Sequence, residues 1–65
     1  MQIIDFVYDE INPTRLDVFV SEKAEVSRSR AAQLIEAQNV LINGKTALKN
    51  AKLKLNDVIE ITLPD

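Results

Sequence analysis

The 65-residue sequence contains no histidine and no cysteine. Histidine is the side chain used most often for proton transfer near neutral pH, and it is also the commonest metal ligand. Without cysteine the chain has no thiol nucleophile, no disulfide and no thiolate metal site. Chemistry would fall to carboxylates, lysines, hydroxyls or the one tyrosine. The sequence therefore favours a domain that has no catalytic residue, no metal site and no cofactor of its own.

Glycine is equally scarce, with one in the whole chain. A single glycine excludes both the dinucleotide-binding fingerprint and the phosphate loop of nucleotide hydrolases, which each need at least two. The acids are not spaced as a calcium loop. Asp9 and Glu10 are adjacent, but neighbouring side chains in a strand or turn point apart. We interpret them as solvated surface acids rather than a catalytic pair.

Long apolar runs are also missing. No stretch approaches the roughly 18 residues that a membrane span needs, and no signal-peptide pattern opens the chain. Hydrophobic residues make up 46% of the sequence, the ordinary share for a folded domain. The sequence predicts one domain over residues 1–65, soluble, cytoplasmic and monomeric.

The charges are segregated along the chain. The net charge of −2 argues mildly against nucleic acid as a partner, because phosphate binding depends on positive charge. However, six acids fall within the first 25 residues, whereas the segment from Ser27 to Lys54 carries six basic residues against one acid, Glu36. This asymmetry leaves RNA open as a partner.

The first third of the chain predicts a strand and a helix. Residues 2–8 alternate and are rich in β-branched and aromatic side chains, which indicates a strand, and an Asn-Pro pair ends it. Thr14 suits the N-cap of a helix over about residues 15–24, and Asp17 suits its positive end. Leu16, Phe19 and Val20 form the apolar stripe of this helix, and Lys23 lies at the end of the stripe.

The rest of the chain predicts a second helix and a β meander. Ser27 suits the N-cap of a helix over about residues 28–38, which would form an αα-hairpin with the first. The meander over residues 40–63 would consist of strands 40–42 and 45–48 around an Asn-Gly turn, and strands 52–55 and 58–63 around an Asn-Asp turn. The expected fold is α+β, with two antiparallel helices packed on one face of a small, mainly antiparallel β-sheet.

The start of the second helix carries two arginines, Arg28 and Arg30. The helix macrodipole makes this end positive, so a cation there is unfavourable by roughly 0.3–1 kcal/mol. An anion at this point would meet free backbone N–H groups, two guanidinium groups and serine hydroxyls, which together favour a phosphate site. The alternative is that the arginines pair with Glu25 or Glu22 across the turn between the helices.

The Asn-Gly turn is followed by Lys45, and Lys49 lies in the next loop. These lysines either belong to the same basic surface or form an ordinary solvated hairpin tip. Lys52 and Lys54 are interpreted as the solvent face of an edge strand, where lysine also discourages aggregation.

Aromatic residues are few, and Phe6 and Phe19 are expected in the core. Proteins that read single strands stack bases on exposed aromatic side chains, so an RNA partner would be structured RNA bound through backbone and shape. A helix-turn-helix for duplex DNA is disfavoured. Its recognition helix would carry polar base-reading side chains, whereas the chain beyond Arg30 is mainly alanine, leucine and isoleucine.

Several short motifs, taken in this order, resemble one family. They are Arg15-Leu16-Asp17, Ser27-Arg28 with Ala31, Gln33-Leu34-Ile35, Val40, Ile42-Asn43-Gly44-Lys45 and Asp57-Val58-Ile59-Glu60-Ile61. Over about residues 15–63 the chain looks like the RNA-binding domain first described in the fourth protein of the small ribosomal subunit, the S-four type. The resemblance implies an S-four-like fold (the αL motif) that binds structured, ribosomal RNA with its second helix start and its hairpin.

The candidate RNA-binding residues follow from this resemblance and from the basic charges. They are Arg15, Ser27, Arg28, Arg30, Gln33, Asn43, Gly44, Lys45 and Lys49. For Arg15 a structural role, pairing with Asp17 or with a neighbouring carbonyl, is the alternative.

The N-terminal strand and the Ser-Arg-Ser-Arg sequence look most like the domain at the front of ribosomal large-subunit pseudouridine synthases. These RNA-modifying isomerases carry their catalytic aspartate in a later domain, so Asp17 is not that residue. The resemblance implies an accessory RNA-binding domain. The alternatives are a stand-alone ribosome-associated factor and a protein–protein adaptor that uses the same basic patch.

Two features depart from the family pattern. Gln38 stands where members often have glycine at the end of the second helix, so that turn is expected to be strained or differently built. Ala32, Glu36 and Asn39 stand where many members carry basic residues. Both departures predict a weak binder that works best attached to another domain that binds or modifies RNA.

Overall fold

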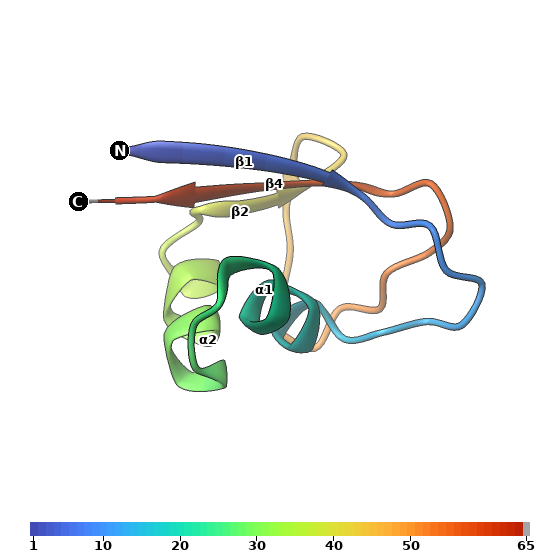
Figure 1. Ribbon diagram of the computed structural model, residues 1–65, viewed down its shortest axis with the longest axis horizontal. Helices are drawn as coiled ribbons and strands as arrows, with labels where there is room; N and C mark the ends of the chain where they lie inside the picture. Colours follow the sequence, from blue (N-terminus) through green and yellow to red (C-terminus); the bar gives the residue numbers. More distant parts are fainter. Residues whose placement is uncertain (65) are drawn as a thin grey trace.

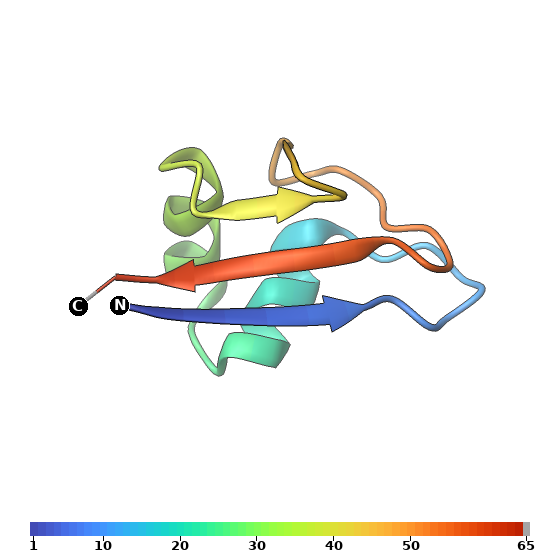
Figure 2. The same ribbon diagram turned by 90° about the horizontal axis from the view of Figure 1, so that it is seen from above.

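The computed structural model describes residues 1–64. Its helices and strands are β1 (Gln2–Val7), α1 (Leu16–Ala24), α2 (Arg28–Glu36), β2 (Val40–Ile42), β3 (Lys45–Thr46) and β4 (Val58–Leu63). Both helices lie on one face of the sheet, as Figure 1 shows from the side and Figure 2 from above. This arrangement confirms the α+β fold expected from the sequence. Neither described helix has the length and apolar character needed to cross a membrane.

The four strands pair antiparallel in the order β1-β4-β2-β3. The last strand, β4, is therefore central, with β1 along one edge and β2 along the other. The expected meander is wrong at residues 52–55, which form no strand; Lys52 makes a single bridge to Arg15. Since β1 and β2 occupy both edges of β4, this segment runs beside the start of α1, and Leu53 is buried in the core. The strand expected over residues 45–48 ends at Thr46.

The core lies between the sheet and the two helices. Inward-facing positions of β4, Ile59 and Ile61, meet the apolar stripes of both helices as the alternation predicted. The buried hydrophobic residues are Tyr8, Leu16, Phe19, Val20, Ala31, Leu34, Ile35, Val40, Leu53, Ile59 and Ile61. Phe6 is half-buried and meets the Phe19 ring edge to face, with ring centroids 5.9 Å apart.

The two helix starts are capped in different ways. Ser27 caps α2 as predicted, since its hydroxyl accepts a hydrogen bond of 3.1 Å from the Arg30 N–H. The prediction that Thr14 caps α1 is wrong, because α1 begins one residue later and has no side-chain cap. The Thr14 hydroxyl instead hydrogen-bonds the Tyr8 hydroxyl at 2.6 Å.

The loop over residues 49–51 takes the place of the missing cap on α1. The Leu16 N–H donates to the Ala51 carbonyl at 2.8 Å, and the Asp17 N–H donates to the Lys49 carbonyl at 3.1 Å. Two of the backbone donors that a helix start leaves unpaired are thereby satisfied. The same bonds fix Lys49 beside the first turn of α1.

Helix α2 ends two residues earlier than expected, and the chain leaves it through Gln38 in the left-handed conformation (φ 64°). The Asn39 N–H donates to the Leu34 carbonyl and the Gln38 N–H to the Ile35 carbonyl, at 2.9 and 3.0 Å. This bond pair defines a Schellman motif. The turn therefore has the usual geometry, with glutamine in the position that glycine prefers.

Candidate nucleic-acid interface

A buried carboxylate joins the starts of the two helices. Asp17, on the first turn of α1, is 4% exposed. Its Oδ2 atom lies 3.0 Å from Arg15 Nη2 and 3.7 Å from Arg28 Nη2, and its Oδ1 atom accepts a hydrogen bond from the Val18 N–H at 2.8 Å. A carboxylate in this setting needs such partners, since an unpaired buried charge is costly. The result is a pair of guanidinium groups held next to each other, a cluster we call the Asp17 hub (Arg15, Asp17 and Arg28).

The hub shows which acid the two arginines pair with. Arg15 does pair with Asp17, and the acid beside Arg28 is Asp17 rather than Glu25 or Glu22. Both arginines nevertheless remain open to solvent, with 41% of the Arg15 side chain and 61% of the Arg28 side chain exposed. A guanidinium has five N–H donors, so each arginine keeps donors for a further anion.

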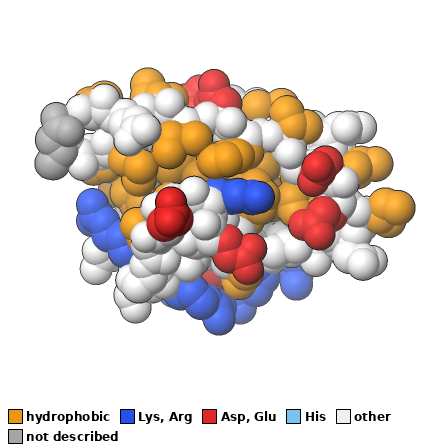
Figure 3. Space-filling view, viewed as in Figure 1, with side chains coloured by type: hydrophobic (Ala, Val, Ile, Leu, Met, Phe, Trp, Pro, Cys, Tyr) orange, Lys and Arg blue, Asp and Glu red, His pale blue; other side chains and the backbone are white. Residues whose placement is uncertain are grey.

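Other candidates on α2 lie on its exposed surface. Arg30 and Gln33 are exposed, and Ser27 holds the helix start with its hydroxyl. Figure 3 shows Lys and Arg side chains gathered along the lower margin of the molecule, where the helices lie in Figure 1, away from the sheet. On the face shown in Figure 3, the basic side chains thus lie mainly on the helix side of the domain.

The Asn-Gly turn forms the predicted hairpin between β2 and β3. Asn43 and Gly44 both have positive φ, 53° and 82°, as a two-residue hairpin turn of the primed kind requires. The Asn43 side chain is engaged within the fold. Its Nδ2 donates to Asp57 Oδ1 at 3.0 Å, and its Oδ1 accepts from the Val58 N–H at 2.9 Å. Lys45, the first residue of β3, is exposed.

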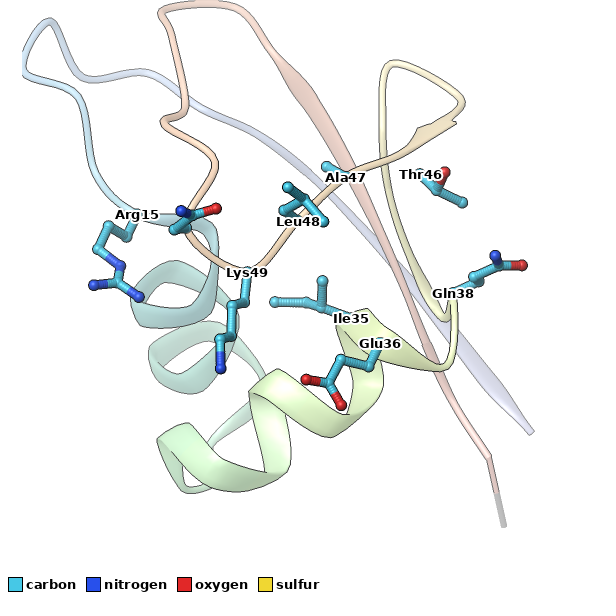
Figure 4. Close-up of a pocket in the computed structure, with 9 residues that line it drawn as sticks. Arg15, Ile35, Glu36, Gln38, Thr46, Ala47, Leu48 and Lys49 are labelled. Atoms are coloured by element: carbon cyan, nitrogen blue, oxygen red, sulfur yellow. The ribbon is translucent and has the colours of Figure 1, made fainter.

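A groove of about 680 Å³ separates the end of α2 from the loop after β3. Figure 4 shows Arg15 and Lys49 at one end, Thr46 and Gln38 at the other, and Ile35, Ala47 and Leu48 between them. Glu36 and Asn50 complete the lining. We call this the α2–loop groove. Sequence reasoning missed it, because residues 35–38 and 46–50 meet only in the tertiary structure.

The groove also shows how the basic candidates are distributed. It brings Lys49 next to Arg15, whereas the β2–β3 hairpin with Lys45 lies toward its opposite end (Figure 4). The Arg15 Nε–H is buried and has no acceptor in the described part of the chain. Lys45 and Lys49, which the sequence left either on one basic surface or at a solvated hairpin tip, thus lie toward different ends of the groove.

The aromatic side chains expose little ring face on which an unstacked RNA base could stack. Tyr8 and Phe19 are buried, and their ring centroids are 5.6 Å apart. Phe6 is half-buried beneath Lys23, whose Nζ atom lies 5.9 Å from the Phe6 centroid. Within the described residues no three potential metal ligands gather in one place. The candidate surface therefore presents cations, amides and aliphatic side chains, together with Glu36 in the groove.

Comparison with known families gives one match. The model of the S4 domain, in general an RNA-binding module, matches residues 14–59, which is well over half of the chain. Comparisons with curated proteins and with solved structures gave no significant match. The matched range contains α1, α2, the hairpin and the hub, and it agrees with the S-four resemblance seen in the sequence. The chain therefore belongs to the S4 domain family.

Proposed function

We propose that this S4 domain binds structured, ribosomal RNA as a monomer, through phosphate and shape contacts. The observation that carries the proposal is the Asp17 hub. Arg15 and Arg28 both form an ion pair with one buried carboxylate, and their side chains are still 41% and 61% exposed. Charge-assisted hydrogen bonds from such groups to phosphate oxygens are short and strong. The free N–H groups at the start of α2 add a favourable dipole beside them.

The lack of an exposed aromatic side chain supports structured RNA over a single strand. Non-specific single-strand binding relies on bases stacked on aromatic rings, and the three rings of this chain are buried or packed against one another. Fixed arginines instead suit a phosphate backbone whose geometry is already set by folding of the RNA. Arg30, Lys45 and Lys49 would extend the contact on either side of the hub, and Ser27, Gln33, Asn43 and Gly44 would line it.

We further propose that the domain serves as the N-terminal accessory domain of an RNA pseudouridine synthase. The support is the resemblance of β1 and the Ser-Arg-Ser-Arg sequence to that class. With a net charge of −2, the domain is suited to weak binding that gains strength when a second RNA-binding unit is linked to it. In this arrangement the domain positions RNA, and the linked domain performs the isomerisation.

Titration against a ribosomal RNA hairpin at several salt concentrations tests the proposal. Log affinity should fall linearly with log salt, and Arg28→Gln should weaken binding and reduce the steepness of the slope by about 1. Lys54→Gln is the matched control, since it removes one exposed positive charge that is not among the candidate contact residues. Circular dichroism checks that both variants stay folded. Absence of binding at low salt, or equal effects of the two variants, would show that the proposal is wrong.

A further inference from the structure

The α2–loop groove presents three kinds of chemistry in order along its length. Cations stand at one end (Arg15 and Lys49), aliphatic side chains in the middle, and neutral hydrogen-bonding groups at the far end (Gln38 and Thr46). A nucleotide has the same order, with an anionic phosphate, a base with apolar faces, and a base edge of donors and acceptors. We propose that the groove receives one unpaired nucleotide of the bound RNA. The inference rests on the proposed function and deepens it.

The cationic end is built before any ligand arrives. The Lys49 carbonyl accepts the Asp17 N–H, and the Ala51 N–H donates to the Leu48 carbonyl at 3.0 Å, which closes the loop as a turn. Arg15 is held from the other side by its ion pair with Asp17. Because the Arg15 guanidinium and the backbone of Lys49 are both positioned by the fold, a phosphate there would bind without first ordering the loop.

The middle of the groove exposes apolar surface that the fold leaves uncovered. Leu48 is 75% exposed, although it lies between the half-buried Ala47 and the wall formed by Ile35. A base laid against Leu48 would remove this apolar surface from water. The groove volume of about 680 Å³ falls within the range of roughly 300–1,000 Å³ typical of small-ligand sites. A paired and stacked base is not free to enter such a site, so the nucleotide must be unpaired.

The far end is formed by Gln38, whose backbone is in the left-handed conformation that is unfavourable for a residue with a Cβ. Gln38 has φ 64°, where glycine would be unstrained. Glycine would also remove the amide that Gln38 contributes to the groove beside Thr46 (Figure 4). An amide offers both donors and an acceptor, as does a base edge. Local strain retained at a ligand site is a known pattern.

Glu36 lies on the α2 side of the groove, with its carboxylate turned toward the Lys49 end (Figure 4). It is the single acid among the residues that line the groove, and its carboxylate would repel a phosphate placed over α2. We therefore expect the phosphate on the Arg15 side of the cationic end, away from Glu36, and the base on the aliphatic side chains and the Gln38 amide.

Two RNA hairpins that differ by one bulged nucleotide test the inference. The bulge carries 2-aminopurine, so that its fluorescence reports the environment of the base while anisotropy reports affinity. The protein should bind the bulged hairpin roughly fivefold more tightly than the fully paired one, less than aromatic stacking provides because the wall is aliphatic. Leu48→Ala and Gln38→Gly should each abolish this preference. Leu55→Ala is the matched control, since Leu55 is also exposed but does not line the groove.

The outcomes separate the inference from the proposed function. Loss of the bulge preference in Leu48→Ala and Gln38→Gly, with the salt slope unchanged and Leu55→Ala like the parent, supports it. Equal affinity of the parent for both hairpins overturns it and leaves the proposed function standing. The inference is also overturned if Leu48→Ala keeps the preference for the bulged hairpin, or if this variant loses the same affinity for both RNAs. If neither hairpin binds, the proposed function fails and the inference falls with it.

Discussion

At the scale of single residues, one buried acid determines the geometry of the basic surface. Asp17 has almost no contact with water and holds arginines from two segments, Arg15 ahead of α1 and Arg28 on α2. In the interior, attraction between opposite charges is screened less than at the surface. The carboxylate also offsets the cost of placing Arg28 at the positive end of α2. The same residue thus links the two helices and arranges the candidate phosphate-binding groups.

Asp17→Asn should lower stability by about 1–3 kcal/mol, because an amide removes the charge that both arginines pair with and leaves them facing each other. For a domain of this size each kcal/mol corresponds to a fall in Tm of about 4–8 °C. Thermal and urea unfolding measure the change. Asp9→Asn, at an exposed acid outside the hub, is the control and should be nearly neutral. Equal stability of the two variants would contradict a structural role for Asp17.

At the scale of elements, the end of α2 shows a local conflict between sequence and geometry. The Schellman bonds of Gln38 and Asn39 are formed, but they place a residue with a Cβ in the left-handed region. The Schellman hydrogen bonds are therefore formed at the steric cost of a Cβ in the left-handed region. The β2–β3 hairpin has less conflict at its tip, because Gly44 takes one of the two positive-φ positions there and Asn43, a residue type that tolerates the left-handed region, takes the other.

Gln38→Gly should raise stability by about 1 kcal/mol. Glycine avoids the left-handed penalty of roughly 1–2 kcal/mol, but its greater backbone entropy in the unfolded chain offsets part of that stabilisation. The same change at Gln33, in the interior of α2, should have the opposite sign and cost about 0.8–1 kcal/mol. Chemical denaturation of both variants measures the two effects. A loss of stability in Gln38→Gly would mean that the glutamine side chain contributes more to the fold than its backbone strain costs.

At the scale of the whole molecule, the N-terminal segment of β1 and Tyr8 contributes to the core although it lies outside the family match. β1 pairs with β4 at six successive positions, and Tyr8, just after it, is 1% exposed. Tyr8 also packs against Phe19 and hydrogen-bonds the Thr14 hydroxyl. The match to the S4 domain begins at residue 14, so the family pattern by itself does not include this layer. A domain of this size buries a smaller share of its surface than a larger domain does, so each strand contributes a large part of its stability.

Removal of residues 1–11 should abolish cooperative unfolding, because it exposes one edge of β4 and the aromatic part of the core. Domains are typically stable by only 5–15 kcal/mol, and small ones fall near the lower limit. Thermal melts followed by circular dichroism, together with dispersion of amide resonances, measure the outcome. The control is the double variant Ile3→Ala and Val7→Ala, which alters exposed positions of β1 and should stay folded. A truncated chain that melts cooperatively would show that β1 is dispensable.

The sequence determined what depends on near neighbours in the chain. Alternation located β1 and β4, helical spacing located α1 and α2, Ser27 marked a helix start, and the Asn-Gly pair marked the hairpin. These features are fixed by backbone sterics and local hydrogen bonds, which the residues specify within a few positions. The same local rules placed Arg28 and Arg30 at the start of α2 and suggested an anion site there.

The tertiary structure decided which distant groups satisfy one another. Thr14 had a suitable side chain for a cap, but the 49–51 loop supplied carbonyls to α1 and the Tyr8 hydroxyl engaged Thr14 instead. Residues 52–55 alternate like a strand, but β1 and β2 had already taken both edges of β4. The pairing of Arg28 with Asp17 and the meeting of Lys49 with Arg15 across the groove arise in the same way. Each depends on competition among segments far apart in the chain, which no local pattern records.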